Sequence, residues 1–134
     1  MVQRATLEAL EQARYDRETA ALRRGFAKKR ALMLDRLKGM GIRPAAAPGG
    51  TFYVWAAIRD LPAPLNDADA FFHACLRKKV MTVPGRFFDV RPLGVRDIDE
   101  PFASWVRFSY GPPEAVVAEG LDRIAGVIAE ARAG

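Results

Sequence analysis

Thr51-Phe-Tyr-Val-Trp-Ala-Ala-Ile58 is the stretch that decides the fold, because β-branched and aromatic residues are concentrated in it. We expect it to form a strand. A turn rich in Pro, Ala and Gly precedes it over residues 44–50, and Pro62 and Pro64 close it. The chain is therefore expected to be built around a β-sheet.

Two further strands are expected downstream. The alternation within Trp105-Val-Arg-Phe-Ser-Tyr110 predicts a strand with a different set of side chains on each face. One face carries Val106, Phe108 and Tyr110, and the other carries Trp105, Arg107 and Ser109. A short strand is expected over residues 80–83, stopped by Pro84-Gly85, and residues 86–103 have no periodicity and predict a long surface loop.

Helical segments accompany these strands. Residues 2–40 contain no proline, which predicts one long helix or two in tandem. A second helix is expected over residues 67–79 with Asn66 as its N-cap, and a third opens at residues 111–114. The third has an apolar stripe made of Val117, Leu121, Ile124 and Ile128. This order predicts an α/β (α+β) domain with a small mixed or antiparallel sheet covered by helices.

The composition limits the class of protein. The chain has 134 residues, of which 50% are apolar and 28% charged, as in one globular domain. The net charge of +5 would permit attraction to nucleic acid, but acids are interleaved with the basic residues over 4–38, as on a solvated helix face. No run approaches the roughly 20 apolar residues of a membrane helix. With Cys75 as the only cysteine, we expect a cytoplasmic protein without a membrane or nucleic-acid partner.

Familiar catalytic constellations are absent. His73 is the only histidine, so a metal site or a histidine-based triad would lack partners, and we expect it to be structural. Asp97 and Asp99 lie in the charged loop and are expected to be solvated. Arg107 stands out, because a guanidinium in an apolar strand is costly to bury without an anionic partner. The side of the strand that carries Arg107 therefore meets solvent, a salt-bridge partner or a ligand cleft. If it meets a ligand cleft, the ligand would be a carboxylate.

Several segments, in order, resemble the C-terminal small domain of class I/II (fold type I) pyridoxal-phosphate-dependent aminotransferases of the aspartate aminotransferase type. The segments are Phe26–Leu32 with Leu37–Ile42, Pro48–Trp55, Lys79–Phe88 and Trp105–Ser109. Gln3–Leu10 is similar to the helix that follows the cofactor lysine. The resemblance covers nearly the whole chain, and it departs from the family at Phe88 or Asp89, where the family often has glycine.

The resemblance implies an interdomain helical region over residues 1–40 and a small domain over 41–134, with the large cofactor-binding domain absent. Arg107 would grip the substrate α-carboxylate while an amino group passes between an amino acid and a 2-oxo acid. In the family, the large domain binds pyridoxal phosphate as a Schiff base to lysine. None of the five lysines here, which are Lys28, Lys29, Lys38, Lys78 and Lys79, has that context, so we expect no catalytic residue and no covalently bound cofactor.

Three interpretations stay open. The chain is a C-terminal aminotransferase fragment, inactive alone, that needs a large-domain polypeptide or a homodimer mate. Alternatively, it is a non-catalytic module that binds a carboxylate ligand or a protein partner, or, more weakly, a basic nucleic-acid-binding protein. Exposed apolar side chains at Leu7, Leu10 and Leu22 would indicate a missing large domain or dimer mate.

Overall fold

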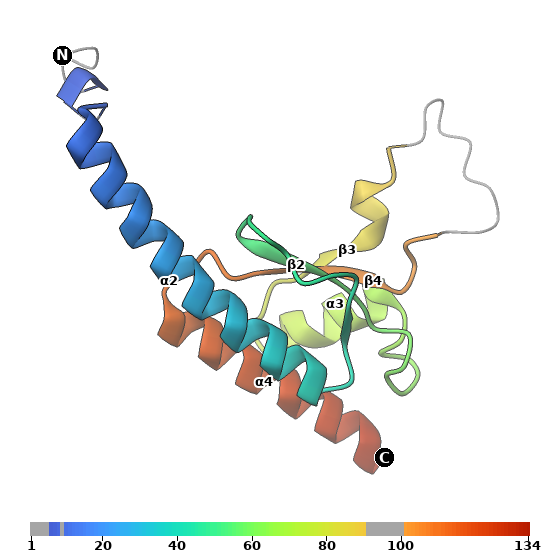
Figure 1. The fold of residues 1–134 in the computed structure, drawn as a ribbon. Coiled ribbons are helices and arrows are strands. Elements are labelled where there is room, and N and C mark those ends of the chain that lie inside the picture. The colour runs from blue at the N-terminus through green and yellow to red at the C-terminus, as the bar shows by residue number, and fades with distance from the viewer. Residues whose placement is uncertain (1–5, 9, 91–100) are drawn as a thin grey trace.

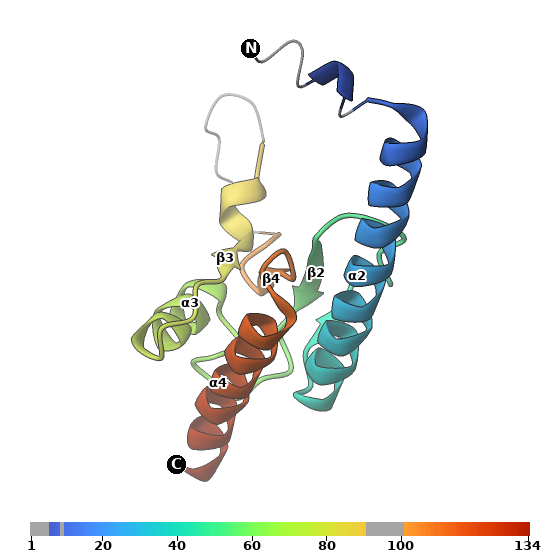
Figure 2. The ribbon, with the colours of Figure 1, turned by 90° about the vertical axis from the view of Figure 1, so that its left-hand side faces the viewer.

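The computed structural model describes residues 6–8, 10–90 and 101–134. Its sheet has four antiparallel strands in the order β1-β2-β4-β3. The strands are β1 (Arg43–Pro44), β2 (Tyr53–Ala57), β3 (Val83–Pro84) and β4 (Trp105–Ser109). The helices are α2 (Gln12–Gly39), α3 (Ala68–Arg77) and α4 (Glu114–Ala133). Figures 1 and 2 show α4 lying between α2 and α3. The predicted small sheet covered by helices is confirmed, and of the two predicted forms, mixed and antiparallel, the sheet has the antiparallel one.

The core lies between the helices and one face of the sheet. The buried strand residues include Val54, Ala56, Val106 and Phe108, the alternate positions of the central pair β2 and β4. The predicted stripe of α4 is also buried, as are Met33 and Leu37 on α2. Complete burial of such a side chain contributes about 1.5–3 kcal/mol, so this two-layer packing fixes the sheet against the helices.

The long N-terminal helical region is interrupted, as the tandem alternative predicts. Residues 6–8 are helical, and α2 begins at Gln12 because the Glu11 carboxylate accepts hydrogen bonds from the backbone N–H groups of Ala13 (3.3 Å) and Arg14 (3.1 Å). The first half of α2 projects away from the sheet, and the second half lies along α4 (Figure 1). None of the described helices is long and apolar enough to cross a membrane.

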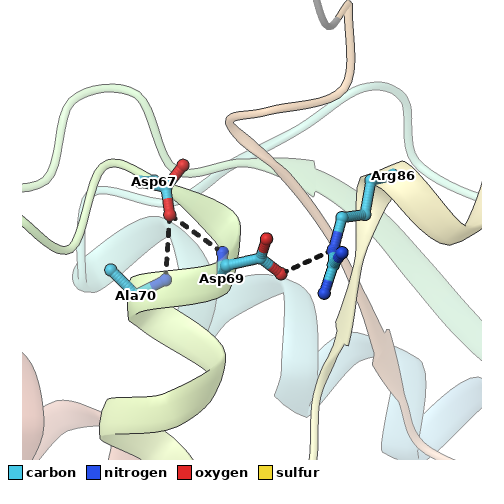
Figure 3. Close-up of polar contacts among 4 residues, drawn as sticks. All are labelled: Asp67, Asp69, Ala70 and Arg86. Carbon is cyan, nitrogen blue, oxygen red and sulfur yellow. Dashed lines mark hydrogen bonds and ion pairs between the residues drawn. The ribbon is translucent and has the colours of Figure 1, made fainter. Parts of the chain in front are cut away.

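The segment from α3 to β3 corrects two boundaries predicted from the sequence. The N-cap is Asp67 rather than Asn66, because its Oδ1 accepts hydrogen bonds from the N–H groups of Asp69 (3.1 Å) and Ala70 (2.9 Å), as Figure 3 shows. At the other end, the Val80 N–H donates to the carbonyl of Cys75 (3.0 Å), so the chain is still leaving the helix there. The predicted helix over 67–79 is therefore too long.

The strand predicted over residues 80–83 forms, but it is displaced toward the C-terminus, and of the predicted residues only Val83 belongs to it. Lys79 has a φ of +61°, and pairing with β4 begins only at Val83. Pro84 belongs to the strand instead of stopping it, which is possible because β3 is an edge strand.

Two short elements were not expected. Arg43 and Pro44 form β1 against β2, at the start of the predicted turn. The predicted loop over 86–103 begins inside a 3-10 helix, η1 (Gly85–Phe88). Both elements are too short to produce periodicity in the sequence. Asp97 and Asp99 lie outside the described residues.

Candidate functional site

Arg107 lies in the middle of β4, on the face of the sheet opposite the helices. Its register partners are Trp55 on β2 and Val83 on β3. The side chain is half-buried, and its guanidinium carbon lies 5.3 Å from the ring centroid of Tyr53 and 4.8 Å from that of Phe88. Cation–π contacts at these distances restrict the orientation of the guanidinium plane.

The electrostatic partner of Arg107 is missing from the described part of the chain. No described carboxylate forms an ion pair with it, and its Nε is buried without a hydrogen-bond partner. A buried donor without an acceptor costs free energy, and a guanidinium without an anion costs more. The terminal Nη atoms of the guanidinium form the planar fork that matches a carboxylate.

A cavity of about 320 Å³ opens beside this guanidinium. It is lined by Tyr53, Trp55, Phe88, Phe102 and Arg107. The volume lies within the range of roughly 300–1,000 Å³ typical of small-molecule sites. These described residues combine the Arg107 cation with an aromatic wall, an arrangement suited to a small carboxylate with an apolar group.

The aromatic wall is braced by contacts between its own rings. Trp55 meets Phe88 and Phe102 edge-to-face, with ring centroids 5.4 Å and 5.7 Å away. On β4, Trp105 stacks against Trp55 at 5.7 Å with an interplanar angle of 9°. Such pairs add stabilisation beyond simple burial, so the rings are held in place before any ligand arrives.

The η1 segment positions Phe88 in this wall. Arg86 donates from Nε to Asp69 Oδ1 at 2.8 Å, which ties η1 to the first turn of α3 (Figure 3). A Cβ on Gly85 would lie 2.5 Å from the carbonyl oxygen of Phe102 and 2.8 Å from that of Trp105. Only glycine lets η1 approach this backbone, and the close approach brings Phe88 to Arg107.

Of the candidate site residues from the sequence that the structure describes, Arg107 is the one that lines this cavity. His73 is within α3, as expected, but its side chain is exposed and contacts Phe72, with ring centroids 5.2 Å apart. Cys75 is buried, and burial raises the pKa of its thiol to about 12, which keeps it protonated. No group of three or more His, Cys, Asp or Glu side chains that could hold a metal ion occurs among the described residues.

The five lysines do not fit the position of a cofactor-bearing residue in this cavity, because none of them lines it. Lys28 and Lys78 form ion pairs with Glu114 (3.0 Å) and Glu130 (2.7 Å). Lys29 donates to the carbonyls of Gly111 and Pro112 at 2.8 and 2.9 Å. Lys38 and Lys79 are exposed.

The aromatic neighbours of Arg107 were not identified as site residues from the sequence. Tyr53 and Trp55 could have been found from the alternation of β2, which places them on the face opposite Val54 and Ala56. Phe88 follows the Pro-Gly step by three residues, in a segment without periodicity. Its position depends on a tertiary contact that no local pattern reveals.

Comparison with known proteins gives the family of the chain. The sequence profile described as Aminotransferase class I and II matches residues 1–124. The chain belongs to this family. Class I and II aminotransferases generally depend on pyridoxal phosphate and act on amino acids and 2-oxo acids. The family expected from the four sequence segments is therefore confirmed.

Individual aminotransferases match almost the entire chain. Aromatic-amino-acid aminotransferase 2 of Thermococcus litoralis is 28% identical over 130 residues, which cover 96% of this chain and 30% of that protein. Aspartate aminotransferase of Pyrococcus abyssi is 27% identical over 129 residues, with the same coverage. The crystal structure of aromatic aminotransferase from Pyrococcus horikoshii superposes with a TM-score of 0.76 and 25% identity, covering 93% of this chain and 30% of that one. The chain thus spans about 30% of the length of the curated relatives it matches.

Proposed function

We propose that the chain is the C-terminal part of a pyridoxal-phosphate-dependent aminotransferase and that Arg107 binds the carboxylate of the substrate. The observation that carries the proposal is a half-buried guanidinium that opens into a cavity and has no acidic partner among the described residues. A carboxylate would satisfy it with two parallel hydrogen bonds. In this proposal residues 1–40 are the interdomain region and residues 41–134 the small domain.

The chemistry of amino transfer is assigned to a large domain outside this chain. That domain holds pyridoxal phosphate, which supplies the electron sink for the reaction. The positions of the five lysines, away from the Arg107 cavity, support this division. The 134 residues alone therefore bind the substrate carboxylate, carry no covalent cofactor and have no transaminase activity. We assign the assembled enzyme to the cytoplasm, where a reduced Cys75 would persist.

The N-terminal helical region supplies the surface that would meet this large domain. Three apolar side chains of this region are exposed: Leu7 (72%), Leu10 (63%) and Leu22 (60%). Exposed leucines at these positions are what the sequence analysis expects if a large domain or dimer mate is missing. A cavity of about 590 Å³ lies where α2 meets the turn at residues 49–51, and Leu22 and Phe26 line it. Because the chain spans only about 30% of the length of these relatives, we propose that this surface contacts the large-domain polypeptide.

Carboxylate binding is tested by NMR titration of the isotopically labelled chain with pyruvate. We expect shifts confined to residues around the cavity and an affinity in the millimolar range, weakened at least about tenfold in Arg107→Gln, since a charge-assisted hydrogen bond contributes roughly 1.5–3 kcal/mol. Arg59→Gln is the matched control, because that exposed arginine lies over Trp105 and does not line the cavity. Equal affinities for pyruvate in the wild type and Arg107→Gln would refute the role of Arg107.

The division of labour is tested separately. The purified chain is mixed with pyridoxal phosphate, reduced with borohydride and mapped by mass spectrometry, in parallel with a transaminase assay. We expect only scattered labelling of surface lysines and no turnover. Stoichiometric labelling of one lysine together with turnover would show that the chain is a complete enzyme.

A further inference from the structure

We infer that a cavity on the helix side of the sheet binds a small neutral molecule with an apolar body and one hydrogen-bonding oxygen. The cavity has a volume of about 240 Å³ and is lined by residues of the first half of α4, the end of β4, α2 and the segment that joins α3 to β3. Phe108 lines it from β4, whereas Arg107 lies on the opposite face of that strand. The inference is therefore independent of the proposed carboxylate site.

Thr82 supplies the polar group that a ligand would meet. This residue is only 4% exposed, and its Oγ1 has no hydrogen-bond partner among the residues that the structure describes. Thr82 is one of the residues that line the cavity, so a molecule bound there can reach the hydroxyl. A buried hydroxyl without a partner costs free energy, and a ligand oxygen that hydrogen-bonds to it would remove that cost.

Most of the other lining residues are apolar. The buried ones come from α2, β4 and α4, and they are Met33, Phe108, Val117, Leu121 and Ile124. Two exposed apolar side chains, Met81 (80%) and Val116 (52%), also line the cavity. An apolar ligand body would cover this surface and gain free energy in proportion to the area removed from water. Because the volume lies below the roughly 300–1,000 Å³ of typical small-molecule sites, the ligand is a small one.

The charged side chains that line the cavity favour a neutral ligand. Arg123 Nη2 and the Glu119 carboxylate form an ion pair at 2.5 Å. Arg123 Nη1 donates to the carbonyls of Lys78 and Lys79 at 3.4 and 3.5 Å, which ties α4 to the end of α3. Lys79 also lines the cavity and is exposed, so its charge stays hydrated. A charged ligand group beside Thr82 would lose its own hydration in exchange for one hydrogen bond to a neutral hydroxyl.

The experiment is an NMR titration of the full chain with ¹³C in its methionine methyl groups. Met33 and Met81 line the cavity, and Met40, which is buried and does not line it, is the internal control. Benzyl alcohol is the probe, and we expect it to shift the signals of Met33 and Met81 but not of Met40, with a Kd of about 1 mM for a ligand of this size. Phenylacetate, a charged counterpart, should bind at least about tenfold more weakly.

A first variant assigns the hydrogen bond. Thr82→Val keeps the shape of the side chain and removes its hydroxyl. It should weaken benzyl alcohol about three- to tenfold, the contribution of one neutral hydrogen bond. Ethylbenzene, which has a methyl group in place of the alcohol hydroxyl, should bind to the wild type and to Thr82→Val with the same affinity.

A second variant fills the cavity. Gly120 lines it from α4, one helical turn after Val116, and no atom lies within 4 Å of a Cβ added at Gly120. Gly120→Leu should therefore fold, as circular dichroism would verify, and abolish binding of both benzyl alcohol and ethylbenzene. Gly126→Leu is the matched control, because Gly126 lies on the same helix with the same free space and does not line the cavity.

Several results would overturn this inference. They are the absence of shifts at Met33 and Met81, an equal affinity for phenylacetate and benzyl alcohol, and a Thr82→Val variant that binds benzyl alcohol as tightly as the wild type. If Gly120→Leu does not fold, the comparison of Thr82→Val with the wild type decides alone. Pyruvate binding, measured in the same samples, should be unchanged in Thr82→Val, so a failure here leaves the role of Arg107 untouched.

Discussion

Replacing Gly85 by alanine tests how tightly η1 must approach the segment before β4. The new Cβ would lie 2.5 Å from the carbonyl oxygen of Phe102, 2.8 Å from its Cβ and 2.8 Å from the carbonyl oxygen of Trp105. Two of the three atoms belong to the backbone, so no side-chain rotation can relieve the overlap. Overpacking of this kind typically costs about 1–3 kcal/mol, and we expect Gly85→Ala to destabilise the fold by the upper part of that range.

The measurement is the free energy of unfolding from urea titrations followed by far-UV circular dichroism. Gly126→Ala is the control, because Gly126 lies within α4, is exposed and has no atom within 4 Å of its added Cβ. It should stabilise the chain by about 0.5–1 kcal/mol through helix propensity. Gly85→Ala should also weaken pyruvate binding, since η1 positions Phe88 against Arg107. Wild-type stability in Gly85→Ala would refute the close approach described above.

Three further predictions concern the cap, the core and the thiol. Asp67→Ala should cost about 1 kcal/mol through loss of the α3 cap, while Asn66→Ala should change stability by less than about 0.5 kcal/mol; equal losses in urea unfolding would contradict the cap assignment. Leu37→Ala should cost about 2–5 kcal/mol because Leu37 is fully buried, whereas Leu22→Ala at an exposed site should cost under about 0.5 kcal/mol, and calorimetry should rank them so. Burial raises the pKa of Cys75 from 9.0 to about 12, so the folded state retains the proton that the unfolded state loses, and stability should fall as pH rises above 9 toward 12. The decline should be shallower in Cys75→Ala, and parallel pH profiles would exclude this linkage.

Strong periodicity made the central elements predictable. The alternation of residues 105–110 placed Arg107 on the face opposite Val106 and Phe108, and the structure agrees. The stripe of α4 predicted its buried face in the same way. These patterns are informative because one face of each element is buried and the other is not.

Elements set by tertiary contacts or by single hydrogen bonds escaped prediction. Two helices in tandem were one of the predicted alternatives, but the position of the break before α2 was not, because the Glu11 carboxylate sets it without any glycine or proline. Lys79 takes a positive φ that favours glycine, and so the end of α3 had no sequence signal. The site itself depends on Phe88 and Phe102, which reach the cavity from a segment without periodicity.

The most direct test of the role of Arg107 is a crystal structure of the chain soaked with pyruvate. We predict that the pyruvate carboxylate accepts hydrogen bonds from the Nη atoms of Arg107 and lies in the cavity lined by Trp55 and Phe102. A bound ligand whose carboxylate lies away from Arg107, or an Arg107 guanidinium paired with an acidic residue of its own chain, would contradict the account.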